Sequence, residues 1–258
     1  VPSTLAQLLR SGLLDKHDTS SLRYVTQAGA AMAPALGARV RAAFPNARLH
    51  VMYGQTEATA RIACLPAEDF DRKPGSVGKA IAGTTIRIVD AEGREVPRGA
   101  TGELVVDGPG VMLGYFRDAE ETARALHGGV LHTGDLASMD EEGHVTLQGR
   151  RSEMIKSGAH RIAPQEIEAV LGELPEIAEG AGTGVPDDVL GQAIVAFLIP
   201  APGAAIDRRA VLAHCLAQLP RFKLPARVEI VDALPRTPSG KLQRWALAAA
   251  VAPVPPRK

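Results

Sequence analysis

The spacing of apolar segments near the start of the chain restricts its fold. Two short segments, Leu22–Gln27 and Leu49–Tyr53, are predicted to be strands. Between them, Pro34–Ala43 begins with a proline, which the first turn of a helix accepts. Strands that alternate with helices are typical of a parallel sheet. We therefore predict an α/β layer over residues 1–73.

From Pro74 onward the pattern becomes one of short, alternating strands. Clusters of Gly, Pro and Asp separate these segments, which is typical of antiparallel hairpins. We therefore predict an antiparallel meander over residues 74–149 and expect it to form a small distorted barrel. The expected strands are Thr85–Val89, Glu103–Asp107 and His144–Leu147, with a short helix at Asp118–Leu126.

A second domain is predicted over residues 150–258, after a first domain over residues 1–149. Roughly one hundred residues are enough for an independent small domain. The order of its helices and strands is that of an α+β fold, so the predicted fold class is α/β followed by α+β. The expected elements are the helices Pro164–Leu174, Asp207–Leu219 and Leu242–Val251 and the strands Gln192–Ile199 and Arg227–Val231.

Composition argues against several classes of protein. Lys plus Arg and Asp plus Glu both number 29, so the formal net charge is zero and a nucleic-acid partner is not expected. No apolar run approaches the length of a membrane span. The two cysteines, Cys64 and Cys215, show no metal-ligand spacing and suit a reducing compartment. We therefore expect a cytoplasmic protein.

Two polar clusters lie at the ends of a turn-rich hairpin, Thr133-Gly134-Asp135 and Gly149-Arg150. Taken singly they are weak signals, because an Asp after a Gly is usually a turn residue and paired arginines are usually solvated. Together, however, an acidic side chain and an arginine can reach a common ligand. Carboxylates bind paired hydroxyls and arginines bind phosphate or hydroxyl oxygens, so a ribose is a candidate.

A third cluster, Tyr53-Gly54-Gln55-Thr56-Glu57, lies at the carboxyl end of a predicted strand. Ligands of open α/β sheets usually bind at that edge. An alternative interpretation is that Thr56 and Glu57 begin a helix, where the dipole favours an acidic side chain.

With these motifs in their order, the chain resembles the acyl-adenylate-forming superfamily of acyl-CoA synthetases, firefly-type luciferases and peptide-synthetase adenylation domains. The resemblance implies that residues 1–149 are the C-terminal part of a large adenylate-binding domain and that residues 150–258 form a mobile lid domain. The matching segments run through nearly the whole chain. They are Gln27–Ala31, Tyr53–Glu57, Gly102–Leu104, Val111–Tyr115, Thr133–Asp135, Gly149–Arg150, Ile155–Gly158 and Pro235–Leu242.

In the first domain, the resemblance implies a nucleotide site. Tyr53 would lie against adenine, and the small residues Gly29, Ala30 and Ala31 would form the opposite wall. Glu57 would hold Mg²⁺ on the ATP phosphates, and Thr56 would contact phosphate. The remaining nucleotide-binding residues implied by the matching motifs are Gly54, Gln55 and Asp135, the last on the ribose hydroxyls, together with Arg150 at the start of the second domain.

In the second domain, the resemblance implies that Lys241 enters the active site and stabilises charge during adenylation. A Walker A interpretation of Ser239-Gly240-Lys241 fails, because Pro235 stands where the first glycine of that motif is required. The hinge residue would be Ser152. The family commonly has Asp or Lys at this position, so the sequence does not show how this hinge would control the rotation of the domain. Lys156, Ser157 and Gly158 would serve the second half-reaction, with Ser157 and Gly158 lining the pantetheine tunnel.

Among the branches of the superfamily we favour an AMP-forming acyl-CoA ligase that uses ATP, Mg²⁺, CoA and a small-molecule carboxylic acid. Peptide-synthetase domains usually have Asn-Gly-Lys where this chain has Ser239-Gly240-Lys241. Two alternatives stay open: a fragment of a peptide-synthetase adenylation domain, and a non-catalytic remnant that binds adenylates or a protein. The sequence does not name the acid.

The family's phosphate-binding loop, which is rich in Ser, Thr and Gly and ends in a Lys, is expected well upstream of Tyr53-Gly54 and is not found there. We therefore expect this chain to be the C-terminal half of a synthetase. The missing N-terminal half would be present in cis or as a separate chain.

Overall fold

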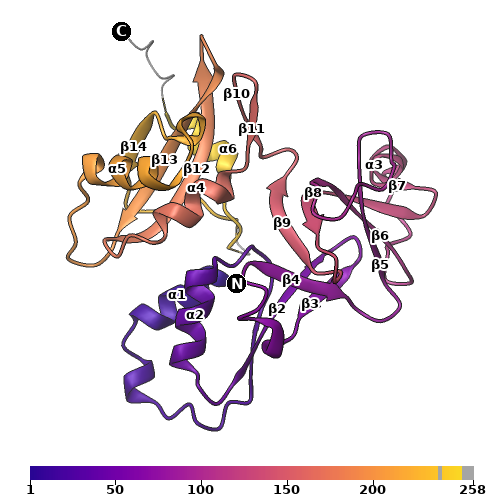
Figure 1. The fold of residues 1–258 in the computed structure, drawn as a ribbon, viewed down its shortest axis with the longest axis horizontal. Helices are drawn as coiled ribbons and strands as arrows, with labels where there is room; N and C mark the ends of the chain where they lie inside the picture. Colours follow the sequence, from indigo (N-terminus) through magenta and orange to yellow (C-terminus); the bar gives the residue numbers. More distant parts are fainter. Residues whose placement is uncertain (238–239, 252–258) are drawn as a thin grey trace. The chain divides into compact units, whose positions relative to one another are not determined.

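The computed structural model describes residues 1–237 and 240–251. The chain divides into two compact units, Val1–Gln148 and Gly149–Lys258 (Figure 1). Sheets dominate both units and helices are few, which confirms the mixed α/β and α+β class.

The first unit is built on a nine-stranded sheet that continues two residues past the unit boundary. Its strand order is β1-β2-β3-β4-β9-β8-β6-β5, and β7 pairs with β8. The strands are β1 (Tyr24–Gln27), β2 (Arg48–Gln55), β3 (Thr59–Leu65), β4 (Ser76–Ala80), β5 (Thr85–Val89), β6 (Gly102–Asp107), β7 (Leu126–His127), β8 (Val130–Met139) and β9 (Val145–Arg150). The helices are α1 (Pro2–Arg10), α2 (Pro34–Ala43) and α3 (Ala119–Ala125), with short 3-10 turns at Leu14–Lys16 and Ala67–Asp69.

The start of this unit is a parallel pair of strands joined through a helix, as predicted. β1 pairs with β2 in parallel, with Gln27 opposite Val51. Between them, α2 begins at Pro34 and ends at Ala43, the range expected from the sequence. Leu5, Leu8 and Leu9 of α1 also pack against the core of this unit. The sequence therefore placed β1, α2 and β2 correctly, to within two residues at each end.

The antiparallel meander is confirmed, but its strands do not close into a barrel within the described residues. The second edge of β4 is occupied by β3, with Ala63 opposite Ala80, so the meander continues the first strands as one open sheet. Gly78 makes this close approach possible, because a Cβ at this position would lie 1.9 Å from the Cys64 carbonyl oxygen. The sequence showed the short strands but not which free edge each would pair with.

Ion pairs hold the β8–β9 turn against the segment that follows β3. The Lys73 ammonium lies 2.6 Å from Asp140 Oδ2 and 2.6 Å from Glu142 Oε1. Arg72 also pairs with Glu142, and its second nitrogen lies 2.7 Å from Asp69 Oδ1. Hydrogen bonds from Lys73 and Arg72 lower the pKa of the Glu142 carboxyl to about 2.

We expect this network to make the protein less stable as the pH falls. A carboxyl whose pKa is lower in the folded state stabilises the fold above its unfolded value, and this contribution is lost as pH falls through the folded value. For Glu142 the window runs from 4.5 down to about 2. Thermal unfolding followed over this window should show a weaker pH dependence in Glu142→Gln than in the wild type. The exposed neighbour Glu141, changed to Gln, is the matched control, and equal slopes for all three proteins would contradict the prediction.

The second unit is an α+β fold around a five-stranded sheet of order β11-β10-β13-β12, in which β14 pairs with β13. Helices α4 and α5 pack on one face of β13, and α6 packs on the other. The strands are β10 (Ile155–Ser157), β11 (His160–Ile162), β12 (Ile177–Asp187), β13 (Gly191–Pro200) and β14 (Arg227–Ile230). The helices are α4 (Pro164–Leu171), α5 (Arg208–Gln218) and α6 (Arg244–Ala249), with a 3-10 turn at Arg221–Lys223.

Strand β12 is the longest element that the sequence did not indicate. It contains Gly180, Gly182 and Gly184, and glycine is normally depleted in strands. In the structure a Cβ at Gly180 would lie 3.3 Å from the side chain of Leu171, and one at Gly182 would lie 3.5 Å from the backbone of Pro164. Gly180 therefore lets α4 pack closely on the strand, and tertiary packing outweighs the local preference.

Candidate nucleotide-binding site

The site in the first unit forms where two parallel strands end. Because β1 and β2 run in the same direction, the segments at their carboxyl ends, Gly29–Ala31 and Tyr53–Glu57, leave the same edge of the sheet. Gly29 has φ +89°, a conformation that favours glycine, and it turns the chain directly after β1. The parallel pairing therefore brings the two predicted nucleotide-binding segments to one edge.

Thr56 and Glu57 lie at the tip of a β-hairpin and not at the start of a helix. Gln55 of β2 pairs with Thr59 of β3, and the ladder is irregular at Gly54. A Cβ at Gly54 would lie 2.4 Å from the Thr59 carbonyl oxygen, so glycine is required for this close approach. The alternative interpretation of a helix start is therefore wrong.

Glu57 is held by residues from the loop after β6. The Tyr115 hydroxyl donates a hydrogen bond of 2.8 Å to Glu57 Oε1. The Met112 amide donates one of 2.8 Å to the Glu57 carbonyl oxygen. Thr56 is exposed and Glu57 is partly exposed, so both side chains are accessible at the tip. Tyr115 belongs to a motif that the sequence showed, but its contact with Glu57 was not predicted.

The centre of the site is a buried hydrogen bond between Tyr53 and Asp135. The Tyr53 hydroxyl donates to Asp135 Oδ2 at 2.6 Å, although the two residues are 82 positions apart in the sequence. Each residue is only 7% exposed. The structure thus joins two residues that the sequence analysis selected separately.

Asp135 is presented from an irregular part of β8. The ladder between β6 and β8 shifts register here, and Gly134 has φ +70°. The Thr133 hydroxyl donates to the Leu104 carbonyl at 2.7 Å and accepts the Asp135 amide at 3.1 Å. The Gly134 amide donates to Glu103 Oε1 at 3.3 Å. Thr133 and Glu103 therefore fix the backbone on which Asp135 stands, a task that sequence reasoning missed.

The loop after β1 is anchored by Gln27, which is fully buried. Its Nε2 donates a hydrogen bond of 2.6 Å to the Ala30 carbonyl oxygen. Its Oε1 is buried and has no hydrogen-bond partner among the described residues. Gln27 belongs to the predicted motif Gln27–Ala31, but nothing in the sequence distinguished it from its neighbours.

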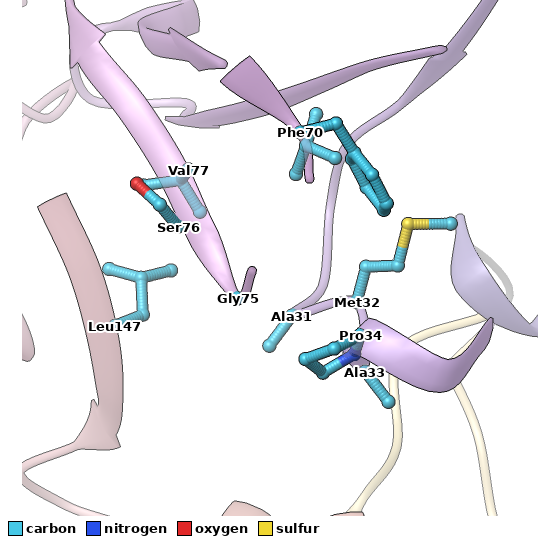
Figure 2. A pocket seen from close by; sticks show the side chains of 10 residues that line it. Ala31, Met32, Ala33, Pro34, Phe70, Gly75, Ser76, Val77 and Leu147 are labelled. Carbon is cyan, nitrogen blue, oxygen red and sulfur yellow. The ribbon is translucent and has the colours of Figure 1, made fainter. Parts of the chain in front are cut away.

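A small cavity lies behind the Ala31 side of this loop. Its volume is about 30 Å³, which is enough for a water molecule but far below the size of a ligand pocket. Figure 2 shows Met32 extending toward Phe70 on one side, while Leu147 lies on the other side beside Ser76 and Val77. This cavity is therefore not a binding site for a carboxylic acid.

In the second unit, three predicted residues line one pocket of about 540 Å³. Arg150, Ser152 and Lys241 all contribute to its wall, together with Arg244 and Trp245. Lys156, Ser157 and Gly158 do not line it. They lie instead at the β10–β11 turn, where Ser157 pairs with His160 and Gly158 has φ +58°. Lys156 is exposed and Ser157 is buried, because successive strand residues face opposite sides.

Lys241 is exposed at the end of a tight loop. The Thr237 amide donates to the Lys241 carbonyl at 2.9 Å, and the Lys241 amide donates to the Thr237 hydroxyl at 3.1 Å. Gly240 has φ +86°, and its amide donates to the Thr237 carbonyl at 2.8 Å. Pro238 and Ser239 of the predicted motif lie outside the described residues. The loop thus places Lys241 immediately before the turn into α6.

Family comparisons agree with this arrangement. Residues 1–116 match the family described as AMP-binding enzyme, and residues 166–241 match the AMP-binding enzyme C-terminal domain. This chain belongs to the AMP-binding enzyme family. The matched regions contain Tyr53 and Glu57 in the first unit and Lys241 in the second.

Proteins similar to this chain include CoA ligases and an amide bond synthetase. The indoleacetate–CoA ligase of Aromatoleum aromaticum is 38% identical over 95% of this chain and 48% of its own length. The amide bond synthetase McbA from Marinactinospora thermotolerans superposes with a TM-score of 0.89, at 36% identity over 96% of this chain and 50% of its own. The anthranilate CoA ligase AuaEII, solved with anthranoyl-AMP, gives a TM-score of 0.89 at 30% identity, over 96% of this chain and 48% of its own.

The chain spans about half the length of the relatives that it matches. In the part of the chain that the structure describes, none of the helices has both the length and the apolar character needed to cross a bilayer.

The hydrogen bond between Tyr53 and Asp135 should contribute to folding as well as to the site. Tyr53→Phe removes the donor from a buried carboxylate, and we expect the free energy of unfolding to fall by about 1–3 kcal/mol. Urea unfolding followed by circular dichroism measures this loss. Tyr24→Phe, at a residue that is 58% exposed, is the control and should change little. Equal stability of both variants would show that the buried hydrogen bond contributes nothing.

Proposed function

We propose that this AMP-binding enzyme activates a carboxylic acid with ATP and transfers the acyl group to CoA. The carboxylate attacks the α-phosphate to form acyl-AMP and pyrophosphate, and the CoA thiolate then attacks the acyl carbon and releases AMP. The observation that supports this best is the buried pair of Tyr53 and Asp135 at the carboxyl edge of β1 and β2. A carboxylate and an aromatic ring at that edge suit a ribose and a base.

In the first unit, the proposed nucleotide contacts are shared between the two strand ends. Asp135 binds the ribose hydroxyls through its carboxylate, whose Oδ2 also accepts the hydrogen bond from Tyr53. Gly29, Ala30 and Ala31 form a wall of small side chains for adenine. Their loop is held in place by the hydrogen bond from Gln27 to Ala30.

Magnesium fits the hairpin tip through a single protein carboxylate. Among the described residues, no group of three or more His, Cys, Asp or Glu side chains is arranged to hold a metal by itself. Mg²⁺ on nucleotides usually takes one or two carboxylates, with phosphates and water filling its other positions. Glu57 would supply that carboxylate and Thr56 would contact phosphate. The ion would neutralise phosphate charge during attack by the carboxylate.

In the second unit, Lys241 stabilises the charge that develops on the phosphate as the acid attacks. A point charge on a flexible stem suits this task. Arg150 adds to the grip on the nucleotide, and rotation of the lid domain, residues 150–258, occurs near Ser152. Lys156, Ser157 and Gly158 serve the step with CoA.

The proposal also concerns the acceptor of the acyl group and the source of the phosphate-binding loop. CoA is favoured because several relatives are CoA ligases, while the structural likeness to an amide bond synthetase makes an amine acceptor the alternative to test. Because the relatives are about twice as long, we propose that a further segment supplies the phosphate-binding loop, in cis or as a separate chain. A cytoplasmic location stays a prediction.

The role of Lys241 is tested by ATP–pyrophosphate exchange with a panel of carboxylic acids, on this chain supplied with the segment that carries the phosphate-binding loop. We expect Lys241→Ala to lower the exchange rate by about 100-fold or more, because a charge aimed at the transition state is lost. Lys79→Ala, at an exposed lysine of the first unit, is the control. Exchange at the native rate in Lys241→Ala would overturn this role. Adding CoA or an amine to the active reaction then identifies the acceptor by the product formed.

The role of Asp135 is tested by titrating the protein with AMP in a calorimeter. Asp135→Asn keeps an acceptor for Tyr53 but removes the charge, so the fold is retained. We expect the dissociation constant to rise by about 10- to 100-fold, since hydrogen bonds to a charged group are the stronger ones. Asp107→Asn, at an exposed residue at the end of β6, is the control. Unchanged AMP affinity in Asp135→Asn would refute the assignment to ribose.

A further inference from the structure

One half-buried arginine of the second unit is not explained by the contacts proposed above. Arg244 begins α6, three residues after Lys241, and its side chain is 13% exposed. Its Nε donates to Glu153 Oε2 at 3.0 Å. Its Nη1 and Nη2 donate to the two oxygens of Glu168 at 2.6 and 3.2 Å. All three nitrogens of the guanidinium are therefore engaged with carboxylates.

The two carboxylates come from different elements. Glu168 lies on α4 and also accepts the Gly182 amide of β12 at 2.9 Å, so it is fixed to the main sheet. Burial raises the pKa of the Glu168 carboxyl, and the adjacent Arg244 opposes that shift. Arg244 thus ties the start of α6 to the rigid part of the unit.

Glu153 belongs to the segment that contains the proposed hinge. It directly follows Ser152, and its amide donates to the Arg150 carbonyl at 3.0 Å, which closes a turn over residues 150–153. Through Glu153, Arg244 holds this turn at a fixed distance from the loop that carries Lys241. The same pocket is lined by Arg150, Glu153, Lys241 and Arg244.

A second arginine holds the other side of the Lys241 loop. Arg236 Nη1 donates to the Gly240 carbonyl at 2.6 Å, and Arg236 also pairs with Glu179 of β12. The loop is therefore fixed on the side of Arg236 by the sheet, while Arg244 fixes the start of α6 and the hinge turn.

We propose that Arg244 is a positioning residue that couples the turn over residues 150–153 to the Lys241 loop through Glu153, with Glu168 as the anchor. The planar guanidinium suits this task, because its donors have a fixed geometry that a lysine ammonium lacks. The functional part of this inference rests on the role proposed for Lys241.

Two variants separate the coupling from simple stability. Glu153→Gln weakens the hydrogen bond between Arg244 and the turn over residues 150–153, and it leaves the Arg244–Glu168 pair in place. Arg244→Lys keeps the positive charge beside Glu168 but loses the planar guanidinium that donates to both carboxylates. Arg244→Ala is avoided, because it leaves the Glu168 carboxylate half-buried without its partner. The matched controls are Glu176→Gln, at a partly exposed residue, and Arg209→Lys, at an exposed residue of α5.

Amide hydrogen exchange of the full chain measures the coupling directly. In Glu153→Gln we expect the amides of Glu153, Gly240 and Lys241 to exchange about tenfold faster or more, because local opening becomes easier. The amides of β13 should keep their wild-type rates, as should all amides in the two controls. Faster exchange confined to Glu153, with Gly240 and Lys241 unchanged, would overturn the coupling.

Kinetics test whether the coupling acts through Lys241. In ATP–pyrophosphate exchange, Arg244→Lys should lower kcat by about 10- to 100-fold with the KM for ATP unchanged, as expected from misplacement of a catalytic group. The same change added to Lys241→Ala should have no further effect. An additive effect, or a change in KM alone, would refute positioning through Lys241. Absence of exchange in the wild type, when it is supplied with the segment that carries the phosphate-binding loop, would count against the proposed function, while the hydrogen-exchange result would still decide the coupling.

Discussion

The first unit depends on the need to keep a buried carboxylate hydrogen-bonded. A carboxyl group that is 7% exposed is costly unless polar partners surround it. The Tyr53 hydroxyl provides one partner from β2, and the irregular ladder between β6 and β8 turns the backbone so that Asp135 can meet it. Thr133 and Glu103 then hold that backbone. A large part of the nine-stranded sheet is thus arranged around one acidic side chain.

In the second unit, the partly buried charged groups that need polar partners are two arginines. Arg244 is engaged by two carboxylates from separate elements, and Arg236 is held by Glu179 and the Gly240 carbonyl. Buried ion pairs of this kind add little to stability relative to apolar packing, and they are better at fixing one geometry. Both arginines flank the loop that ends in Lys241. The chemistry around that loop therefore favours a defined position for the lysine.

Errors in the predicted fold had particular physical causes. The open sheet was mistaken for a barrel because strand patterns show which segments pair but not which edges remain free, and β3 occupies the edge of β4 that closure would need. The helix interpretation of Thr56 and Glu57 failed because the close approach allowed by Gly54 makes a hairpin. Strand β12 was missed because its glycines lower the local strand preference, although one of them, Gly180, lets α4 pack closely there.

By itself, the sequence determined the class of fold, the positions of α2 and β5, and the family to which the chain belongs. These follow from apolar spacing, the proline in the first turn of α2 and ordered motifs, which are local properties of the chain. Only the tertiary structure decided that Tyr53 meets Asp135, that Tyr115 meets Glu57, and that Arg244 joins Glu153 to Glu168. The partners in these contacts are separated by 58 to 91 positions, with Arg244 and Glu168 lying 76 apart. Their pairing depends on strand register and helix packing, which no local pattern records.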